Sequence, residues 1–302
     1  MESMTPDAAQ RHVIDAAVSA SGVVIGAPGT GKTTTLVARV IALLEVHALP
    51  PEALLVLTPS RQAATHLRDA IGVRIGQATP GPLARSLASF AFQVVRAAAV
   101  RAGEEPPALL TGADQDRIIA DLLAGDADDE ADGAPSRWPA QLSPAVRAST
   151  GFRSELRAFL AECTERGVTA AELRASDNET WRSVGDFLTE YRAVQEHMRS
   201  AHRDIPDLVS EAAALLRRVD DATLGPLSDL RIVLIDDAQE LTPGGVSLVR
   251  ALRARGIAVL AFGDPDISSG TFRGASPQLF DELVTSLERV FVLEEPTVRS
   301  RR

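Results

Sequence analysis

Short apolar runs alternate with segments of helical periodicity in the first hundred residues, and the same alternation returns after residue 230. A short apolar run between turn residues predicts a buried strand, and apolar residues three and four positions apart predict a helix. This pattern predicts strands at residues 21–25, 53–58, 230–235, 257–262 and 290–293, and helices at 33–44, 61–71, 83–101, 246–255 and 277–287. Such alternation is typical of a parallel sheet covered by helices on both faces.

Residues 103–204 have a different character, because they contain helical periodicity, including 154–165 and 179–199, but few strand signals. We therefore expect two domains. The first is an α/β domain built from residues 1–102 plus 205–302, and the second is a helical insertion at 103–204. No internal repeat is visible in the chain.

The composition is that of a globular protein, with 45% hydrophobic and 24% charged residues. A single cysteine, Cys163, excludes an intrachain disulfide and suits a reducing cytoplasm. No apolar run approaches the roughly 18 residues of a membrane helix, so no membrane association is expected. The N-terminus also lacks the basic and apolar regions of a signal peptide.

The net charge of −10 is concentrated in the middle of the chain, where residues 103–204 carry 11 basic and 20 acidic groups. Part of that excess is the run Asp126–Asp132, which we expect to form a solvated, mobile loop. No basic stripe is visible, so any affinity for nucleic acid would come from local placement of charge or from a partner.

The chain has one lysine among its 31 basic residues, and that lysine lies in a glycine-rich loop. Gly26–Thr33 reads GAPGTGKT, which is the phosphate-binding pattern G-x-x-x-x-G-K-[ST]. The glycines allow backbone N–H groups to surround phosphates, Lys32 reaches the β and γ oxygens, and the Thr33 hydroxyl would ligate Mg²⁺. A chance glycine turn is the alternative, and the flanking strand and helix argue against it.

A carboxylate for the Mg²⁺ site is expected at the end of a later strand. The apolar run at 232–235 ends in Asp236, which would hold the metal, and in Asp237, which would orient or deprotonate the attacking water. The alternative is a solvated Asp-Asp turn. The strand at 257–262 is also followed by an acid, Asp264, and then by Arg273. This pair is a candidate either to sense the γ-phosphate or to couple it to a second ligand.

In their order along the chain, these segments resemble the motifs of UvrD/Rep-type superfamily 1 DNA helicases. GAPGTGKT resembles motif I, VLTPSRQAATHLRDAI motif Ia, ARSLASFAFQVVR motif Ib, LIDDAQE motif II, GDPDISSGTFRGA motif III and LEEPTVRS motif IV. The resemblance implies a RecA-like core with a 1B-type helical insertion. It also implies ATP-dependent DNA unwinding, with ATP and Mg²⁺ bound by the core and single-stranded or duplex DNA as the partner.

The resemblance also assigns residues. For ATP it implies Gln10 as the adenine reader and Arg299 as a γ-phosphate arginine, with catalytic roles for Lys32, Asp237 and Arg273 and metal binding by Thr33 and Asp236. The remaining nucleotide contacts would come from the loop and the residue after it, namely Gly26, Ala27, Pro28, Gly29, Thr30, Gly31, Lys32, Thr33 and Thr34. For DNA it implies Thr58, Ser60 and Arg61 of motif Ia, Ser89 of motif Ib and the aromatic Phe272.

Within that family, the sequences GAPGTGKTTTL and IDDAQEL are similar to the AdnA branch. Proteins of this branch are actinobacterial subunits that pair with an AdnB-type subunit in a helicase–nuclease for DNA break repair. The resemblance therefore implies a second helicase–nuclease subunit as a partner.

The motifs also depart from the family pattern. The usual motif II glutamate is Asp237, the motif III glutamine is Ile267, and the adenine-clamping arginine and tyrosine fall at Thr34 and Val298. Each change removes or shortens a polar or aromatic contact. The chain also ends at Arg302, after motif IV, so a second RecA-like domain is expected outside this sequence.

Two readings therefore remain open. The first is the motor half of an ATP-dependent helicase, and the second is a degenerate subunit that holds nucleotide and DNA beside an active partner. A GTPase is excluded, because its N-K-x-D motif needs a second lysine. A small-molecule kinase does not account for a helical insertion of about 100 residues.

Overall fold

The computed structural model describes residues 6–75, 79, 81–197, 202–267, 276–287 and 289–293. The chain divides into two compact units, the first formed by Met1–Ala102 with Val209–Arg302 and the second by Gly103–Leu208.

The first unit is built on a six-stranded parallel sheet with the strand order β3-β2-β6-β7-β1-β8. The strands β2, β6 and β7 are buried from end to end, and all their residues except Thr58 are apolar, as expected for a sheet covered on both faces. The strands are β1 (Gly22–Ile25), β2 (Leu54–Thr58), β3 (Ala84–Ser86), β6 (Ile232–Ile235), β7 (Ala258–Gly263) and β8 (Val290–Val292).

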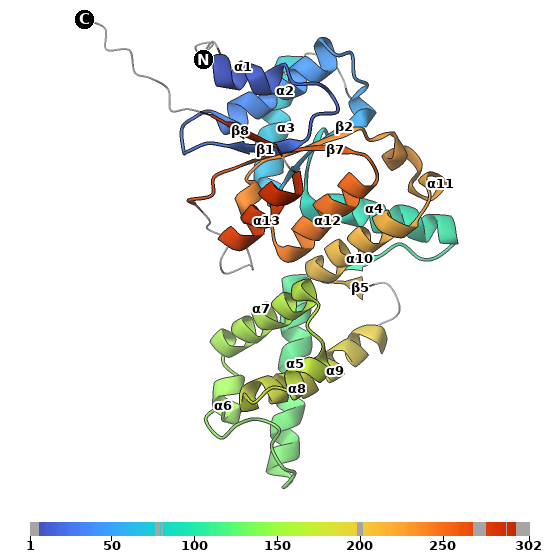
Figure 1. Cartoon of the computed structure of the whole chain (residues 1–302). Helices are drawn as coiled ribbons and strands as arrows, with labels where there is room; N and C mark the ends of the chain where they lie inside the picture. Colours follow the sequence, from blue (N-terminus) through green and yellow to red (C-terminus); the bar gives the residue numbers. More distant parts are fainter. Residues whose placement is uncertain are drawn as a thin grey trace, which may run out of the picture. The chain divides into compact units, whose positions relative to one another are not determined.

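Helices cover both faces of this sheet (Figure 1). One face carries α1 (Ala8–Ile14), α2 (Lys32–Glu45) and α3 (Arg61–Ile75), and the other carries α4 (Leu87–Ala102), α12 (Pro243–Ala254) and α13 (Pro277–Leu287). Shorter elements complete the unit: α11 (Asp221–Leu224), η1 (Pro51–Ala53), η2 (Gly225–Asp229) and η3 (Ala238–Glu240). The predicted α/β fold with a parallel sheet is therefore confirmed.

One predicted helix is wrong in its first turn. The helix expected at 83–101 begins only at Leu87, because the residues before it form the edge strand β3, which pairs in parallel with β2. The backbone N–H of Val56 donates to the Leu83 carbonyl at 2.7 Å. The hydroxyl of buried Ser86 accepts a hydrogen bond from the Ser89 N–H at 3.2 Å and caps the start of α4.

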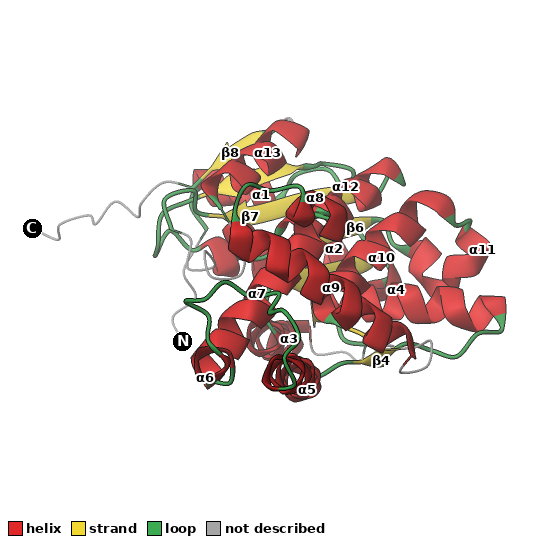
Figure 2. Ribbon diagram, turned by 90° about the horizontal axis from the view of Figure 1, so that it is seen from below, coloured by secondary structure: helices red, strands yellow, loops and turns green. Residues whose placement is uncertain are grey.

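The second unit is almost entirely helical, as the red ribbons of Figure 2 show. Its elements are α5 (Gly112–Ala131), α6 (Pro144–Arg147), α7 (Thr150–Arg166), α8 (Ala170–Arg174) and α9 (Glu179–His197), with a two-stranded parallel pair β4 (Ala108–Leu109) and β5 (His202–Arg203). Its core includes Ile119, Leu160, Phe187 and Leu188. Helix α10 (Ile205–Arg218) begins in this unit and continues into the first. Among the described helices, none is long and apolar enough to cross a bilayer.

The mobile loop expected at 126–132 is wrong, because these residues form the last turns of α5 and its C-cap. Asp126 is buried and accepts hydrogen bonds from the Arg137 guanidinium and from the Trp138 Nε1–H, the latter at 2.6 Å. Glu130 accepts from Arg147, whose side chain is buried, at 2.7 and 2.8 Å. The acidic charges are thus compensated by cations that lie 11 and 17 positions further along the chain.

Another buried acid, Asp204, leads to a prediction about pH. The Asp204 carboxylate accepts hydrogen bonds from the Asp207 N–H at 2.8 Å and from the Gln115 amide at 3.2 Å. Burial, followed by the nearby charge of Asp207, raises the pKa of Asp204 to about 7. The folded state therefore binds this proton more tightly than the unfolded chain, in which an aspartate has a pKa of about 3.9. Stability from this group is fully present below about pH 4 and is lost as the pH rises to about 7.

We therefore expect Asp204→Asn to stabilise this unit by about 2 kcal/mol at pH 8 and to have little effect at pH 4. Asparagine keeps the acceptor for the Asp207 N–H and carries no charge. Urea unfolding followed by tryptophan fluorescence measures this unit, because both tryptophans of the chain, Trp138 and Trp181, lie in it. The exposed Asp177→Asn is the control, and equal stability of wild type and Asp204→Asn at pH 8 would contradict the prediction.

Candidate functional site

The glycine-rich loop connects the end of β1 to the start of α2, so its backbone lies at the helix N-terminus. Gly29 and Gly31 have φ angles of 85° and 82°, a conformation that side chains other than glycine rarely adopt. A Cβ on Gly31 would also lie 2.8 Å from the Gln10 amide nitrogen, and a Cβ on Gly26 would collide with the Thr30 hydroxyl. The loop therefore keeps a backbone cradle that a substituted side chain would disrupt or fill.

The single lysine lies across this loop. Lys32 Nζ donates hydrogen bonds to the Gly26 carbonyl at 2.6 Å and to the Ala27 carbonyl at 3.1 Å, and it lies 3.8 Å from Asp264 Oδ2. Asp264 is 3% exposed, and its Oδ2 atom is buried without a hydrogen bond among the described residues. The Lys32 ammonium is thus held at the mouth of the cradle by groups that phosphate oxygens can replace.

The carboxylate at the end of β6 meets the first turn of α2. Thr33 Oγ1 donates to Asp236 Oδ2 at 3.2 Å, although the two residues are 203 positions apart in the sequence. Asp236 is 5% exposed. Burial, then the neighbouring Asp237, raises the pKa of Asp236 to about 6, and the hydrogen bond from Thr33 and the charge of Lys32 act in the opposite direction.

This donor set fits Mg²⁺, which prefers a few protein oxygens and keeps much of its water. A buried carboxylate paired with a hydroxyl, close to an ammonium that would face phosphate, is the arrangement in which a divalent cation relieves the cost of burying the negative charge. Thr33 and Asp236 would hold the cation. The phosphate loop and its metal-ligand candidates are therefore together at the carboxyl edge of the sheet.

The backbone at Asp237 is unusual, with φ 50° and ψ 46° in the left-handed region. Gln239, which sequence reasoning did not assign to the site, donates to Asp237 Oδ1 at 3.4 Å and accepts from the Asp264 N–H at 3.2 Å. It therefore links the ends of β6 and β7. The only signal for it in the sequence is its place three residues after Asp236 in IDDAQE. Gly263 leaves room for it, since a Cβ there would lie 2.9 Å from Gln239 Oε1.

The expected adenine reader packs on the phosphate loop. Gln10 is 8% exposed, donates to the Thr30 carbonyl at 3.1 Å and accepts from the Asp7 N–H at 3.1 Å. One amide N–H and one carbonyl lone pair remain for a base edge. Around it, Pro28, Gly29, Thr33 and Thr34 are exposed, Ala27 is half-buried, and Thr30 is buried with its hydroxyl donating to the Ala27 carbonyl.

The residues expected to contact DNA lie at the carboxyl ends of β2 and β3. Arg61 and Ser89 are exposed on the first turns of α3 and α4. Ser60 caps α3 by accepting from the Ala63 N–H at 3.1 Å. Thr58 is 1% exposed and its hydroxyl donates to the Ser60 carbonyl at 2.7 Å, so its side chain holds the turn instead of facing outward. Phe272, Arg273 and Arg299 lie outside the described residues.

The chain is similar to known proteins over most of its length. A family model described as the UvrD/REP helicase N-terminal domain matches residues 7–287. The ATP-dependent DNA helicase Rep of Salmonella typhimurium is 20% identical over 278 residues, which cover 89% of this chain and 37% of Rep.

Two further relatives have similar coverage. The ATP-dependent DNA helicase PcrA of Staphylococcus aureus is 22% identical over 257 residues, and the ATP-dependent DNA helicase UvrD1 of Mycobacterium leprae is 22% identical over 266 residues. Each alignment covers 84% of this chain and 32% of the relative. The chain thus spans about a third of the length of these curated relatives.

Proposed function

Because this chain belongs to the UvrD/REP helicase N-terminal domain family, we propose that it is the ATP-binding motor portion of a UvrD-like DNA helicase. The observation that carries the proposal is the convergence of Lys32, Thr33, Asp236 and Asp264 from three separate segments onto one glycine cradle. Phosphate binding at a helix N-terminus beside an acidic strand end is the arrangement that phosphoryl-transfer ATPases use.

In this proposal each residue has a distinct task. The backbone of Gly26–Gly31 holds the phosphates, Lys32 donates to the β and γ oxygens, and Thr33 with Asp236 holds Mg²⁺. Bound Mg²⁺ would neutralise charge on the phosphate oxygens. Asp237 would orient or deprotonate the attacking water, with its carboxylate held by Gln239. Arg273 and Arg299 would stabilise the charge of the γ-phosphate, and Gln10 would read adenine.

DNA is the proposed macromolecular substrate, contacted at the carboxyl ends of β2 and β3. Arg61 would neutralise a backbone phosphate, and Ser60 and Ser89 would donate hydrogen bonds to it. Phe272 would stack on a base. The Thr58 hydroxyl donates to the Ser60 carbonyl, so Thr58 would contribute to DNA binding by fixing the shape of the turn.

We further propose that the chain belongs to an AdnA-type subunit, which works with an AdnB-type partner in a helicase–nuclease for double-strand break repair. The support is the similarity of GAPGTGKTTTL and IDDAQEL to that branch. The alternative role is a degenerate subunit that binds nucleotide and DNA with little hydrolysis. Ile267 favours this alternative, because it stands 47% exposed where the family has a glutamine and cannot donate a hydrogen bond.

The test of the proposed site is the Mg²⁺ dependence of nucleotide binding. Asp236→Asn keeps the shape and an acceptor for Thr33 but removes the charge, so we expect about a tenfold or greater loss of Mg-ADP affinity, with no loss in EDTA. Calorimetric titration of ADP with and without Mg²⁺ measures both. Asp266→Asn, an exposed position after β7, is the control. An unchanged Mg²⁺ effect in Asp236→Asn would refute the metal assignment.

A further inference from the structure

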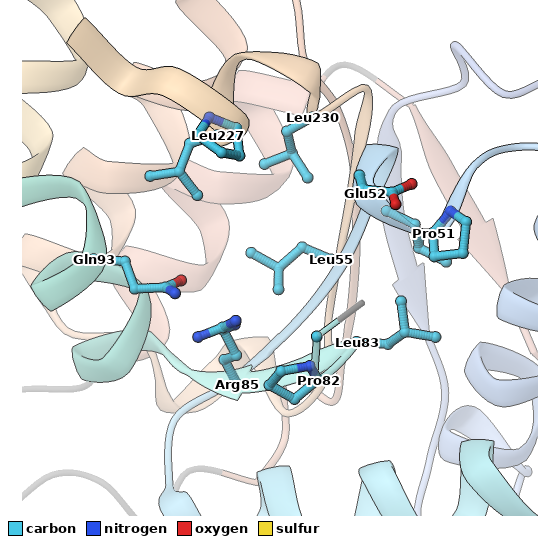
Figure 3. A pocket seen from close by; sticks show the side chains of 12 residues that line it. Pro51, Glu52, Leu55, Pro82, Leu83, Arg85, Gln93, Leu227 and Leu230 are labelled. Carbon is cyan, nitrogen blue, oxygen red and sulfur yellow. The ribbon is translucent and has the colours of Figure 1, made fainter. Parts of the chain in front are cut away.

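A pocket of about 230 Å³ lies in the first unit, at the opposite end of the sheet from the phosphate loop. It is formed where β2 and β3 begin, between η1, η2 and α4 (Figure 3). Leu54 and Leu55 start β2, Leu83 precedes β3, and Leu227 and Leu230 come from η2 and its C-cap. With three prolines beside them, these side chains make the wall largely apolar.

Two polar side chains that line this pocket have no partner within the described part of the chain. The guanidinium of Arg85 and the amide of Gln93 form no hydrogen bond or ion pair there. Figure 3 shows both groups directed to the same side of the pocket, Arg85 from β3 and Gln93 from α4. The acidic lining residue, Glu52, is exposed and lies beside Pro51, away from Arg85 (Figure 3).

Arg85 is in an unfavourable environment as it stands. It is half-buried, and burial together with the like charge of Arg68 lowers its pKa below the ordinary value. Arg68 is exposed and donates to Thr65 Oγ1 at 2.8 Å. Within the described residues, neither arginine forms an ion pair with a carboxylate. An uncompensated, partly desolvated guanidinium destabilises a fold. Such a group in a cleft is a candidate for ligand binding.

We propose that this pocket binds an apolar group of about the size of one leucine or phenylalanine side chain that carries a carboxylate. The carboxylate pairs with the Arg85 guanidinium, whose planar fork matches two carboxylate oxygens, and accepts a further hydrogen bond from the Gln93 amide. The apolar part lies on Leu55, Leu227 and Leu230. The volume is below the roughly 300–1,000 Å³ of pockets that enclose drug-sized ligands, so a nucleotide does not fit.

This chemistry has two sources: a free small carboxylic acid, or the C-terminal residue of a polypeptide. Both present a side chain next to a carboxylate, and a peptide with a free C-terminus distinguishes them. The pocket shares no residue with the phosphate loop, so an experiment can contradict this proposal without contradicting the proposed motor function, and the reverse.

The test compares two probes that differ only at the carboxyl group, which is a charged acceptor in one and a neutral amide in the other. The 302-residue chain is titrated with N-acetyl-leucine and with N-acetyl-leucinamide, and binding is followed by amide chemical shifts in the NMR spectrum. A charge-assisted pair with Arg85 predicts that the acid binds at least about tenfold more tightly than the amide. Equal binding of acid and amide, or binding of neither at about 10 mM, a free energy near 3 kcal/mol, overturns the proposal.

The variants identify the residue responsible. Arg85→Met keeps the length and loses the charge, so it should abolish the preference for the acid, whereas Arg96→Met, an exposed position on α4, should keep it. Because Arg85 has no partner among the described residues, Arg85→Met should also melt at the same or a higher temperature than wild type. A large fall in the melting temperature of Arg85→Met with an unchanged preference for the acid overturns the proposal. Gln93→Leu is a second test, because it should weaken binding of N-acetyl-leucine and leave binding of the amide unchanged.

A third probe decides the source. A six-residue peptide that ends in leucine with a free carboxylate should bind about tenfold more tightly than N-acetyl-leucine if the pocket takes a polypeptide C-terminus, because the preceding residues add contacts. If the peptide binds no more tightly than N-acetyl-leucine, the pocket takes a free small acid.

Discussion

Replacing Lys32 with alanine is expected to reduce the affinity for Mg-ADP by about 100-fold or more. A hydrogen bond to a charged group contributes about 1.5–3 kcal/mol, and the ammonium would make more than one to phosphate oxygens. No other lysine exists in the chain to take its place. Calorimetric titration with Mg-ADP measures the loss, and equal affinity in the variant and in wild type would show that the loop does not bind phosphate.

Lys32→Arg separates charge from shape. Arginine keeps the positive charge, but its planar fork is larger than the compact ammonium that now lies within 3.1 Å of two loop carbonyls. We therefore expect this variant to bind Mg-ADP nearly as poorly as the alanine variant. Near-normal binding would mean that only the charge matters.

Both variants need a control for folding. Lys32→Ala leaves the buried carboxylate of Asp264 without its cation, and Lys32→Arg places a larger group in the loop, so each change can destabilise the site independently of any nucleotide. Thermal unfolding measures that effect. Arg74→Ala, which removes a positive charge from the exposed end of α3, should leave Mg-ADP affinity unchanged.

Much of the core could be predicted from sequence because its signals are local. The strands β6 and β7 are continuous apolar runs, and α2 follows the loop with apolar residues at helical spacing. The edge strand β3 could not be predicted in this way. It is three residues long and continues directly into the apolar pattern of α4, so only its pairing with β2 distinguishes it.

The acidic end of α5 was mispredicted for a related reason. Composition treats Asp126 and Glu130 as solvated charges that repel one another. In the structure these carboxylates face cations from the following segment. Arg137 pairs with Asp126, Arg147 pairs with Glu130, and the Trp138 Nε1–H donates to Asp126. Such compensation depends on the packing of α6 and the preceding loop, which a charge count does not contain.

The candidate site also combines features that a local sequence pattern predicts with features that it does not. The glycine loop and the acidic strand end were predicted because fixed spacings define them. The link from Asp237 through Gln239 to Asp264, and the left-handed backbone of Asp237, depend on where β6 and β7 end relative to one another. Those relations come from the sheet order and not from a local pattern.

Restoring the family residues at two positions is expected to raise ATP turnover about 100-fold if the motor is degenerate. Asp237→Glu extends the carboxylate by one methylene, and a misplacement of about 1 Å in a catalytic group can cost on the order of 10²-fold. Ile267→Gln restores a hydrogen-bonding side chain at an exposed position near Asp264, whose carbonyl accepts from the Ile267 N–H at 3.4 Å. Glutamate tolerates the left-handed backbone at 237 less well than aspartate does, so a stability loss of about 1 kcal/mol is expected with it.

The ATP turnover of wild type and of the double variant has to be compared in a protein that also contains a second motor domain. The 302-residue chain alone should show negligible ATPase activity with or without single-stranded DNA. An arginine from a second motor domain, which the family resemblance implies, is worth about 10³–10⁵ in rate. The double variant is therefore measured in a longer protein that includes such a domain, together with the partner subunit proposed above. A rise in the turnover of the variant motor itself supports the degenerate-motor reading. High turnover before any substitution would show instead that Asp237 and Ile267 are compatible with an ordinary motor, and that the geometry around Gln239 already places the Asp237 carboxylate well enough for catalysis.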